Sequence, residues 1–152
     1  MAQRDIRALS SQQIEDLLAG RGMMLALPAE LNGWPGPMHV LEHATALDLS
    51  PAQRRDTEAL MAAHRAEARS LGARLVEEER EMDAAFRERR ITAEDITDRT
   101  NRIGTLQAAL RAEHLRTHLL QTALLSPEQV TRYAELRGYT AATPSSGHRH
   151  RH

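Results

Sequence analysis

The sequence predicts an all-α protein, and three observations support this fold class. Aromatic residues make up only 3% of the chain, while the helix-favouring residues Ala, Leu, Glu and Arg are abundant. Apolar residues recur every three or four positions along two stretches of more than thirty residues. The phrase Leu-Ser-Pro-x-Gln stands at residues 49–53 and again at 125–129. Together these features predict a long antiparallel helical hairpin with short flanking helices.

Composition limits the classes of function. The formal net charge is −1, and all 20 basic residues are arginine, which argues against a dedicated nucleic-acid-binding protein. The absence of cysteine excludes disulfides and thiolate metal sites. No apolar run approaches the ~20 residues of a membrane span, and no secretory signal is visible. We therefore expect any export signal or membrane anchor to be absent from this sequence.

The chain divides into three predicted parts, the first of which is residues 1–36. A short helix capped by Ser10 or Ser11 is expected to end at Gly20. Residues 22–37 contain three prolines and three glycines, so we predict an ordered loop without a helix. Its large apolar side chains are expected to be buried, and these are Met23, Leu25, Leu27, Leu31 and Trp34.

Residues 37–139 form the predicted hairpin domain. One helix begins at Pro37 and runs to about Leu47. The first long helix opens with Ser50 as its cap and carries an apolar stripe of Leu60, His64, Ala68, Leu71, Leu75, Met82 and Phe86. The second is capped by Thr92 and carries Ile96, Ile103, Leu106, Leu110, Thr117, Leu120 and Leu124. Gly104 is expected at a close helix contact. The last helix runs from the cap Ser126 towards Gly138.

The first long helix would extend about 57 Å, which is long for a compact domain of this size. We therefore expect an intertwined homodimer in which a second copy completes the core. Residues 140–152 are predicted to be a disordered His/Arg tail that includes His148, His150 and His152.

The duplicated phrase is the most specific motif in the chain. A reversal near Ile91 would bring Leu49 and Leu125 to the same end, where both leucines plug the core and each Ser and Gln closes a helix start. This pattern resembles the periplasmic Spy/CpxP family, which is named for a Leu-Thr-x-x-Gln motif that occurs twice, and its metal-responsive ZraP and CnrX-type members. Ser50 and Ser126 replace the family's threonine. The resemblance implies a hooked helical hairpin, a homodimer, a periplasmic location and no enzymatic activity.

Histidines supply the candidate metal ligands. His39/His43 and His114/His118 are i, i+4 pairs, which place two imidazoles on one helix face. Counting from Ile91 puts His64 and His118 level, each about 40 Å along the hairpin, with Glu67 opposite His114. The predicted metal site comprises His39, Glu42, His43, His64, Glu67, His114 and His118.

The metal could be Zn, Ni, Co or Cu(II). A buried hydrogen-bonded role for His64 and a chance origin for each pair are the alternatives. Met23, Met24 and Met38 favour either a Cu(I) thioether site or ordinary core packing. We found no catalytic arrangement and expect no organic cofactor.

The leading hypothesis is a non-catalytic, periplasmic, metal-binding stress or resistance protein. It would be either a transition-metal sensor or a metal-responsive accessory protein, and a membrane-bound regulator would respond to its metal-bound state. The alternative is a Spy-like chaperone that binds unfolded proteins. A third is an adaptor that only recognises another helix.

Overall fold

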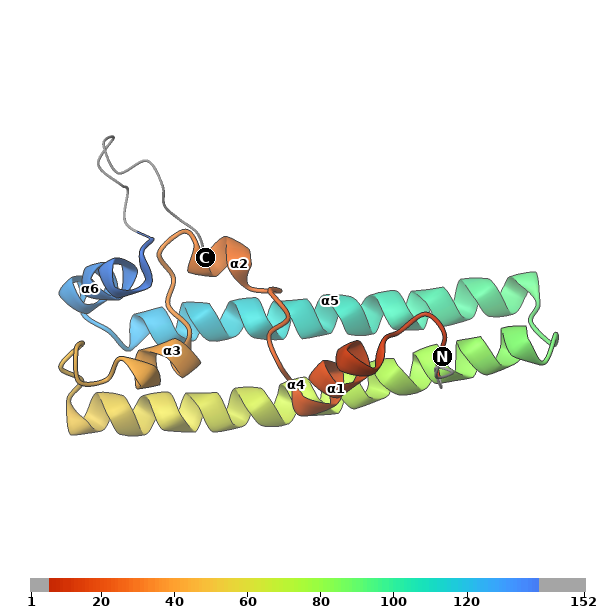
Figure 1. Ribbon diagram of the computed structural model, residues 1–152, viewed down its shortest axis with the longest axis horizontal. Helices are drawn as coiled ribbons and strands as arrows, with labels where there is room; N and C mark the ends of the chain where they lie inside the picture. Colours follow the sequence, from red (N-terminus) through yellow and green to blue (C-terminus); the bar gives the residue numbers. More distant parts are fainter. Residues whose placement is uncertain (1–5, 140–152) are drawn as a thin grey trace. The chain divides into compact units, whose positions relative to one another are not determined.

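The computed structural model describes residues 6–139, and the secondary structure of this part of the chain is entirely helical. The elements are α1 (Ser11–Ala19), α2 (Leu27–Glu30), α3 (Pro37–Glu42), α4 (Pro51–Arg87), α5 (Ala93–Ala123) and α6 (Pro127–Arg137). Two long helices and short flanking helices are therefore present, as Figure 1 shows. The predicted fold class is confirmed at this level. No helix in residues 6–139 combines the length and apolar character that crossing a membrane requires.

The described residues form two compact units. Unit 1 comprises residues 6–23 and 65–113, and unit 2 comprises residues 24–64 and 114–139. Each unit thus combines one part of α4 with one part of α5 and with a segment that precedes α4. The predicted division of the chain into residues 1–36, 37–139 and 140–152 remains a prediction from the sequence.

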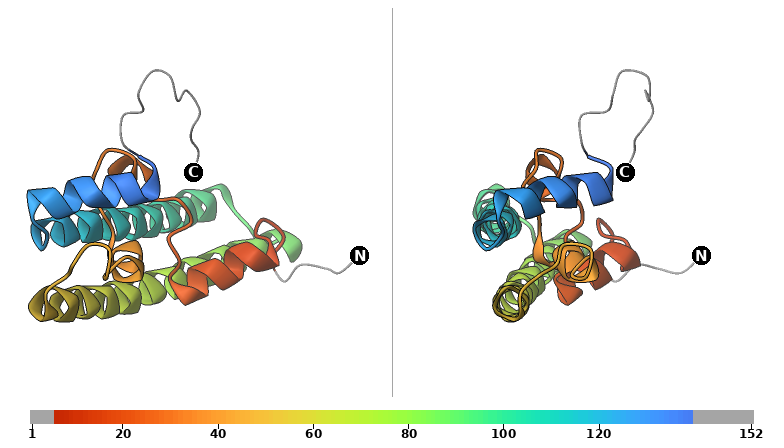
Figure 2. Two further views of the ribbon diagram at one scale, coloured as in Figure 1. Left: turned by 60° about the vertical axis from the view of Figure 1, so that its left-hand side comes forward. Right: turned by 90° about the vertical axis from the view of Figure 1, so that its left-hand side faces the viewer.

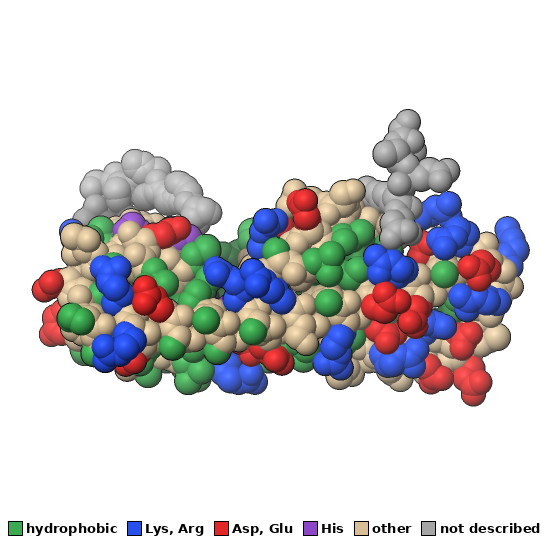
Figure 3. Space-filling model, turned by 90° about the horizontal axis from the view of Figure 1, so that it is seen from below, with side chains coloured by type: hydrophobic (Ala, Val, Ile, Leu, Met, Phe, Trp, Pro, Cys, Tyr) green, Lys and Arg blue, Asp and Glu red, His purple; other side chains and the backbone are tan. Residues whose placement is uncertain are grey.

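Unit 1 has an apolar core between the two long helices. Ion pairs at the rim join Arg99 to Glu81 at 3.3 Å and Arg102 to Glu78 at 3.1 Å. Figure 3 shows acidic and basic side chains interspersed on one face of the molecule. Because the segment between α4 and α5 is only residues 88–92, the two helices meet through a short connection. The buried side chains of this core are Ala68, Leu71, Leu75, Val76, Ala85, Ile103, Leu106 and Leu110.

Helix α1 packs closely on α4 within unit 1, and Figure 2 shows the two helices side by side. A Cβ atom at Gly72 would lie 1.9 Å from the carbonyl oxygen of Leu17, so only glycine permits this approach. The expected close contact at Gly104 is wrong, since nothing lies within 4 Å of a Cβ atom there. The small residue that matters for packing is therefore on the other long helix.

Helix ends follow the predicted caps. Ser10 and Ser126 cap α1 and α6, each in a complete capping box, and Gly20 and Gly138 end those helices in the left-handed conformation. Thr92 Oγ1 accepts the backbone N–H of Asp95 at the start of α5. Local hydrogen bonding accounts for these boundaries, which is why the sequence reveals them.

Three expectations about the flanking segments are wrong. The predicted loop contains the single-turn helix α2, because Pro28 is tolerated in a first turn. Leu31 and Trp34 are 45% and 42% exposed rather than buried. Helix α3 ends at Glu42 rather than near Leu47, and the chain continues through turns to Asp48, whose φ is 55°.

The ends of the two apolar stripes are also more exposed than expected. Phe86 is 52% exposed, Ile96 is 40% exposed and Leu120 is 50% exposed. The 3.6-residue period predicts a face, but neighbouring elements decide how far along the helix that face is covered.

Candidate metal site and glutamine clasp

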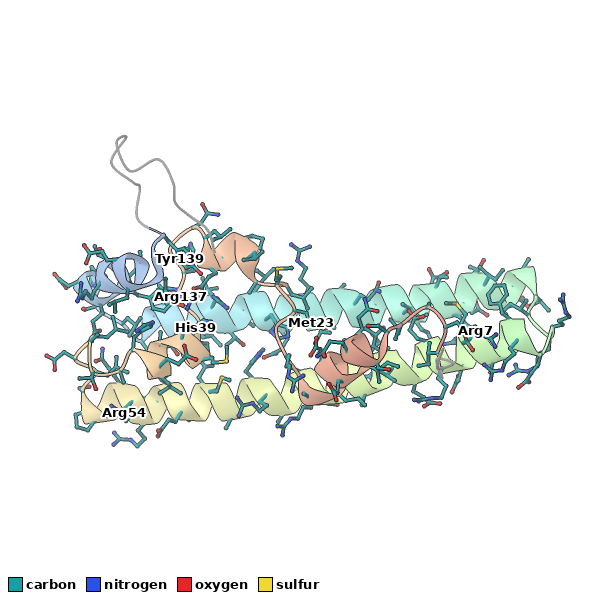
Figure 4. The ribbon with its side chains drawn as sticks, in the orientation of Figure 1. Arg7, Met23, His39, Arg54, Arg137 and Tyr139 are labelled. Atoms are coloured by element: carbon teal, nitrogen blue, oxygen red, sulfur yellow. The ribbon has the colours of Figure 1, made fainter. Side chains whose placement is uncertain are left out.

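All five histidines in the described part of the chain lie in unit 2, although the two units are similar in size. His39 is on α3, and Figure 4 labels it there, while His43 is the C-cap of that helix. His64 is on α4, and His114 and His118 are on α5. The three chain segments that carry the candidate histidines therefore belong to one compact unit.

His64 and His114 meet edge to face between the two long helices. Their ring centroids are 4.6 Å apart with planes at 74°, and the residues are 8% and 4% exposed. Thr117 Oγ1 lies 2.9 Å from His64 Nδ1. Counting from Ile91 placed His64 level with His118, and its observed partners Thr117 and His114 lie one and four residues before that position.

His118 points towards the segment that precedes α3. Its Nδ1 lies 2.7 Å from the backbone oxygen of Trp34. Since a carbonyl oxygen only accepts hydrogen bonds, Nδ1 carries the proton, and the lone pair of the neutral ring is on Nε2. Gly36 makes room for the ring, because a Cβ atom there would lie 2.6 Å from His118 Nε2.

The early histidine pair is arranged differently. His39 Nδ1 lies 2.7 Å from Glu42 Oε1, and this hydrogen bond lowers the pKa of the Glu42 carboxyl group. The proton is again on Nδ1, because an ionised carboxylate only accepts. The His43 backbone N–H bonds to the His39 carbonyl and closes the helix. Glu67 is exposed on the unit 1 part of α4.

The predicted ligands are therefore grouped in pairs. The structure brings His64 to His114 and His39 to Glu42, whereas His118 contacts the loop that precedes α3. Within residues 6–139, no group of three or more His, Asp or Glu side chains is gathered closely enough to hold a metal ion. The tail histidines lie outside the described residues, and all seven assignments remain predictions. Met24 and Met38 are 76% and 49% exposed, so neither is core packing.

A polar cluster around the buried Glu30, which includes His118, was not predicted. Glu30 is 7% exposed, and its Oε2 accepts a 2.6 Å hydrogen bond from the hydroxyl of Tyr133 on α6. Arg137 Nε lies 3.5 Å from the same oxygen, and His118 Nδ1 lies 3.5 Å from Oε1. We call these four residues the Glu30 cluster.

Burial and hydrogen bonding within the Glu30 cluster keep the hydroxyl of Tyr133 protonated. Burial, followed by the hydrogen bond to Glu30, raises the pKa of Tyr133 above its ordinary value, so the hydroxyl stays a donor. Arg137 also lies 5.6 Å over the ring of Tyr139, and Figure 4 shows the two labelled side chains near the end of α6. The one signal in the sequence was that Glu30 is the sole acidic residue between Asp16 and Glu42.

The duplicated phrase forms a second polar arrangement in unit 2, which we call the glutamine clasp. Gln53 and Gln129 exchange two amide hydrogen bonds, at 2.7 and 3.0 Å. Gln53 also donates to the Leu124 carbonyl at 3.0 Å, and Gln129 donates to the Leu47 carbonyl at 3.1 Å. Each glutamine thus caps the start of its own helix. It also binds a backbone carbonyl just before the other copy of the phrase.

Leucines of the two phrases meet in one core, as predicted. Leu49 and Leu125 pack against the buried cluster of Val40, Leu47 and Tyr133. The serines act as expected, since Ser50 and Ser126 accept the backbone N–H groups of Gln53 and Gln129. What the phrase did not reveal was the direct pairing of the two amides.

Comparison with known proteins found no matching protein family, no matching curated protein and no matching solved structure.

Proposed function

We propose that unit 2 binds a transition-metal ion through imidazole nitrogens, and that the protein is a non-catalytic metal sensor or metal-responsive accessory protein. One observation carries this proposal. Histidines that ligate metals usually donate the proton of their other ring nitrogen to a carboxylate or carbonyl oxygen. His39 and His118 both have Nδ1 anchored in this way, on Glu42 and on the Trp34 carbonyl.

The donor set also suits this class of ion. Anchored Nδ1 atoms orient two rings with Nε2 as the available ligand atom, and His64 and His114 place two further imidazoles in ring contact. Neutral imidazole is a ligand for Zn, Ni, Co and Cu(II), and competition among these ions favours copper on affinity alone. His43, one turn after His39, completes the pair on α3.

Metal binding is tested by titrating the metal-free protein with Ni(II), Co(II), Zn(II) and Cu(II) in a calorimeter. We expect binding to weaken strongly or disappear in His114→Ala/His118→Ala. A matched control is His148→Ala/His152→Ala, which changes two histidines outside the described residues. Unchanged stoichiometry and affinity in the first variant would refute the site.

We further propose that α4 and α5 form one antiparallel hairpin and that two copies associate in the periplasm. The register supports the hairpin, because Glu78 pairs with Arg102 in unit 1 and Thr57 pairs with Gln121 in unit 2. The periplasmic location and a membrane-bound regulator as partner follow from the family resemblance. Sedimentation equilibrium tests the dimer, and fractionation of cells that express the natural gene tests the location.

A chaperone is the second candidate, and the exposed apolar side chains of unit 2 favour it. Contiguous patches of exposed apolar side chains mark surfaces that bind other proteins. An aggregation-suppression assay tests it, with Trp34→Ser/Leu120→Ser expected to lose protection and Phe86→Ser in unit 1 as the control. No protection by the wild-type protein at several-fold molar excess would exclude it. The exposed set in unit 2 is Met24, Leu31, Trp34, Met38, Leu119 and Leu120.

A further inference from the structure

We infer that a second copy of this chain docks on the end of unit 1 where α4 passes into α5. The surface consists of residues 86–96, which we call the α4–α5 turn, and Figure 1 shows it where the two long ribbons join. This inference rests on the dimer proposed above and names its contact surface. It does not involve the metal.

Large apolar side chains at the α4–α5 turn lie on helix faces that are buried further along each helix. Phe86 follows Leu75 by about three helical turns, and Ile96 precedes Ile103 by about two. Leu75 and Ile103 are buried, whereas Phe86 is 52% exposed and Ile96 is 40% exposed. The chain before α1 reaches α4 at Asp83, whose carboxylate accepts a backbone N–H of that segment about one turn before Phe86. Both apolar stripes therefore extend past their cover, and a partner that buried them would gain by removing apolar surface from water.

The charges of the turn favour a second copy over a partner of one charge sign. Arg89 and Glu94 are both exposed, and neither has an ion-pair partner within the described residues. Arg90, by contrast, pairs with Glu88 at 2.8 Å. Under two-fold symmetry, a contact between Arg89 of one copy and Glu94 of the other occurs twice. A uniformly acidic or basic partner would attract one of these charges and repel the other.

The backbone at Arg89 has a conformation that favours glycine. Its φ is 58°, its N–H bonds to the Phe86 carbonyl at 3.1 Å, and the next N–H bonds to the Ala85 carbonyl at 3.0 Å, which is a Schellman arrangement. Gly20 and Gly138 have the left-handed conformation at the ends of α1 and α6. An arginine at this position costs conformational free energy that a glycine would not. A contact between its charge and a second copy gives the side chain a role.

The α4–α5 turn is small, which sets the expected strength of the contact. Stable interfaces bury roughly 1,200–2,000 Å² in total, and even those of about 1,600 Å² range down to micromolar affinity. A contact centred on two apolar side chains from each copy is therefore expected to dissociate in the micromolar range or above.

Sedimentation equilibrium of the full chain in metal-free buffer, from micromolar to millimolar concentration, tests the apolar contact. Phe86→Ser/Ile96→Ser is expected to raise the dissociation constant of the dimer about 30-fold, as truncation of apolar residues at the centre of an interface does. Leu18→Ser is the matched control, because Leu18 is 48% exposed on α1 of the same unit. It should dimerise as the wild type does.

Charge reversal tests the pairing of Arg89 with Glu94. Arg89→Glu and Glu94→Arg are each expected to weaken the dimer about 3- to 10-fold, because both pairs then join like charges. In an equimolar mixture of the two variants, one chain carries only acidic and the other only basic side chains at positions 89 and 94. Every contact in a mixed dimer is again between opposite charges, so mixed dimers are expected to form with at least wild-type affinity.

A further variant separates a lost contact from a folding defect. Arg89→Gly removes the charge and relieves the left-handed backbone. Its unfolding temperature, measured at a concentration where the wild type is monomeric, should equal or exceed that of the wild type. Its dimer should nevertheless be about 3-fold weaker, since two exposed ion pairs are lost.

A wild-type dimer whose affinity is unchanged in Phe86→Ser/Ile96→Ser, or charge-reversed variants that form no mixed dimers, would overturn the inference while leaving the proposed dimer intact. A wild type that stays monomeric up to millimolar concentration would overturn both, and metal binding would still be decided by its own titration.

Discussion

Each unit contains one part of α4 and one part of α5, but the side chains buried on these two helices differ between the units. In unit 1 the contact is made by aliphatic side chains such as Leu71, Leu75 and Leu106. In unit 2 the buried positions of α4 and α5 are Thr57, His64, His114, Thr117 and Gln121. Buried polar groups stabilise a fold poorly and cost free energy when a partner is lost. The two units thus differ in the chemistry of their interiors, since α4 and α5 bury aliphatic side chains in unit 1 and polar side chains in unit 2.

The glutamine clasp offers the largest expected effect. Gln53→Ala removes the bond to Ser50, the bond to the Leu124 carbonyl and the amide pair with Gln129, so we expect a loss of roughly 3 kcal/mol in the free energy of unfolding. Gln13→Ala is the matched control in unit 1, because Ser10 and Gln13 form the same capping box without an amide partner. It should lose only about 1 kcal/mol.

Urea denaturation of the single variants and of Gln53→Ala/Gln129→Ala measures the coupling between the two amides. The double variant is expected to lose less than the sum of the singles, by about 0.5–3 kcal/mol. Strict additivity would mean that the amides do not act as a pair.

Glycine substitutions separate close packing from helix propensity within unit 1. Gly72→Ala places a Cβ atom against the Leu17 carbonyl, and we expect a loss of about 1–3 kcal/mol with faster hydrogen exchange in α1. Gly104→Ala meets open space and should gain about 0.5–1 kcal/mol. Equal stabilisation by both changes would show that α1 does not pack on α4 at this point.

A polar pair in unit 2 is expected to be nearly dispensable for stability. Thr57→Val/Gln121→Leu removes both partners of the 3.1 Å hydrogen bond, and it removes the buried Gln121 Oε1, for which residues 6–139 offer no hydrogen-bond donor. Unfolding free energy should stay within about 1 kcal/mol of wild type, while Thr57→Val alone should lose about 1–3 kcal/mol. A large loss in the double variant would show that the polar core of unit 2 is itself stabilising.

The smallest effect concerns pH and a carboxylate of unit 1. Burial raises the pKa of Glu79 above its ordinary 4.5, so the folded state binds this proton more tightly than the unfolded state does. The residue therefore costs stability as the pH rises through and above 4.5. Glu79→Gln should be slightly more stable than wild type at pH 7 and equal to it near pH 3. Glu58→Gln, an exposed change, should show no such difference in thermal melts at the two pH values.

Local patterns predicted much of the backbone. The caps Ser10, Ser126 and Gly138 depend on hydrogen bonds within four or five residues, so their positions could be inferred from short motifs. Long stretches in which apolar residues recur every three or four positions likewise predicted α4 and α5. The single turn of α2 and the early end of α3 escaped, because short elements are held by tertiary contacts rather than by periodicity.

For the candidate site, the sequence supplied the residues and not their grouping. Spacing identified the pairs His39/His43 and His114/His118, but the anchoring of His118 on the Trp34 carbonyl joins residues 84 positions apart. The Glu30 cluster depends on a contact between Glu30 and Tyr133 across 103 positions. No short motif encodes such distances.

By itself, therefore, the sequence determined the helical class, the starts of the helices and the convergence of Leu49 and Leu125 in one core. Only the tertiary structure decided which side chain each buried polar group meets, including the pairing of Gln53 with Gln129. The physical reason is that caps and helical periods are satisfied by neighbours along the chain. A buried amide or carboxylate instead takes its partner from whichever element folds against it.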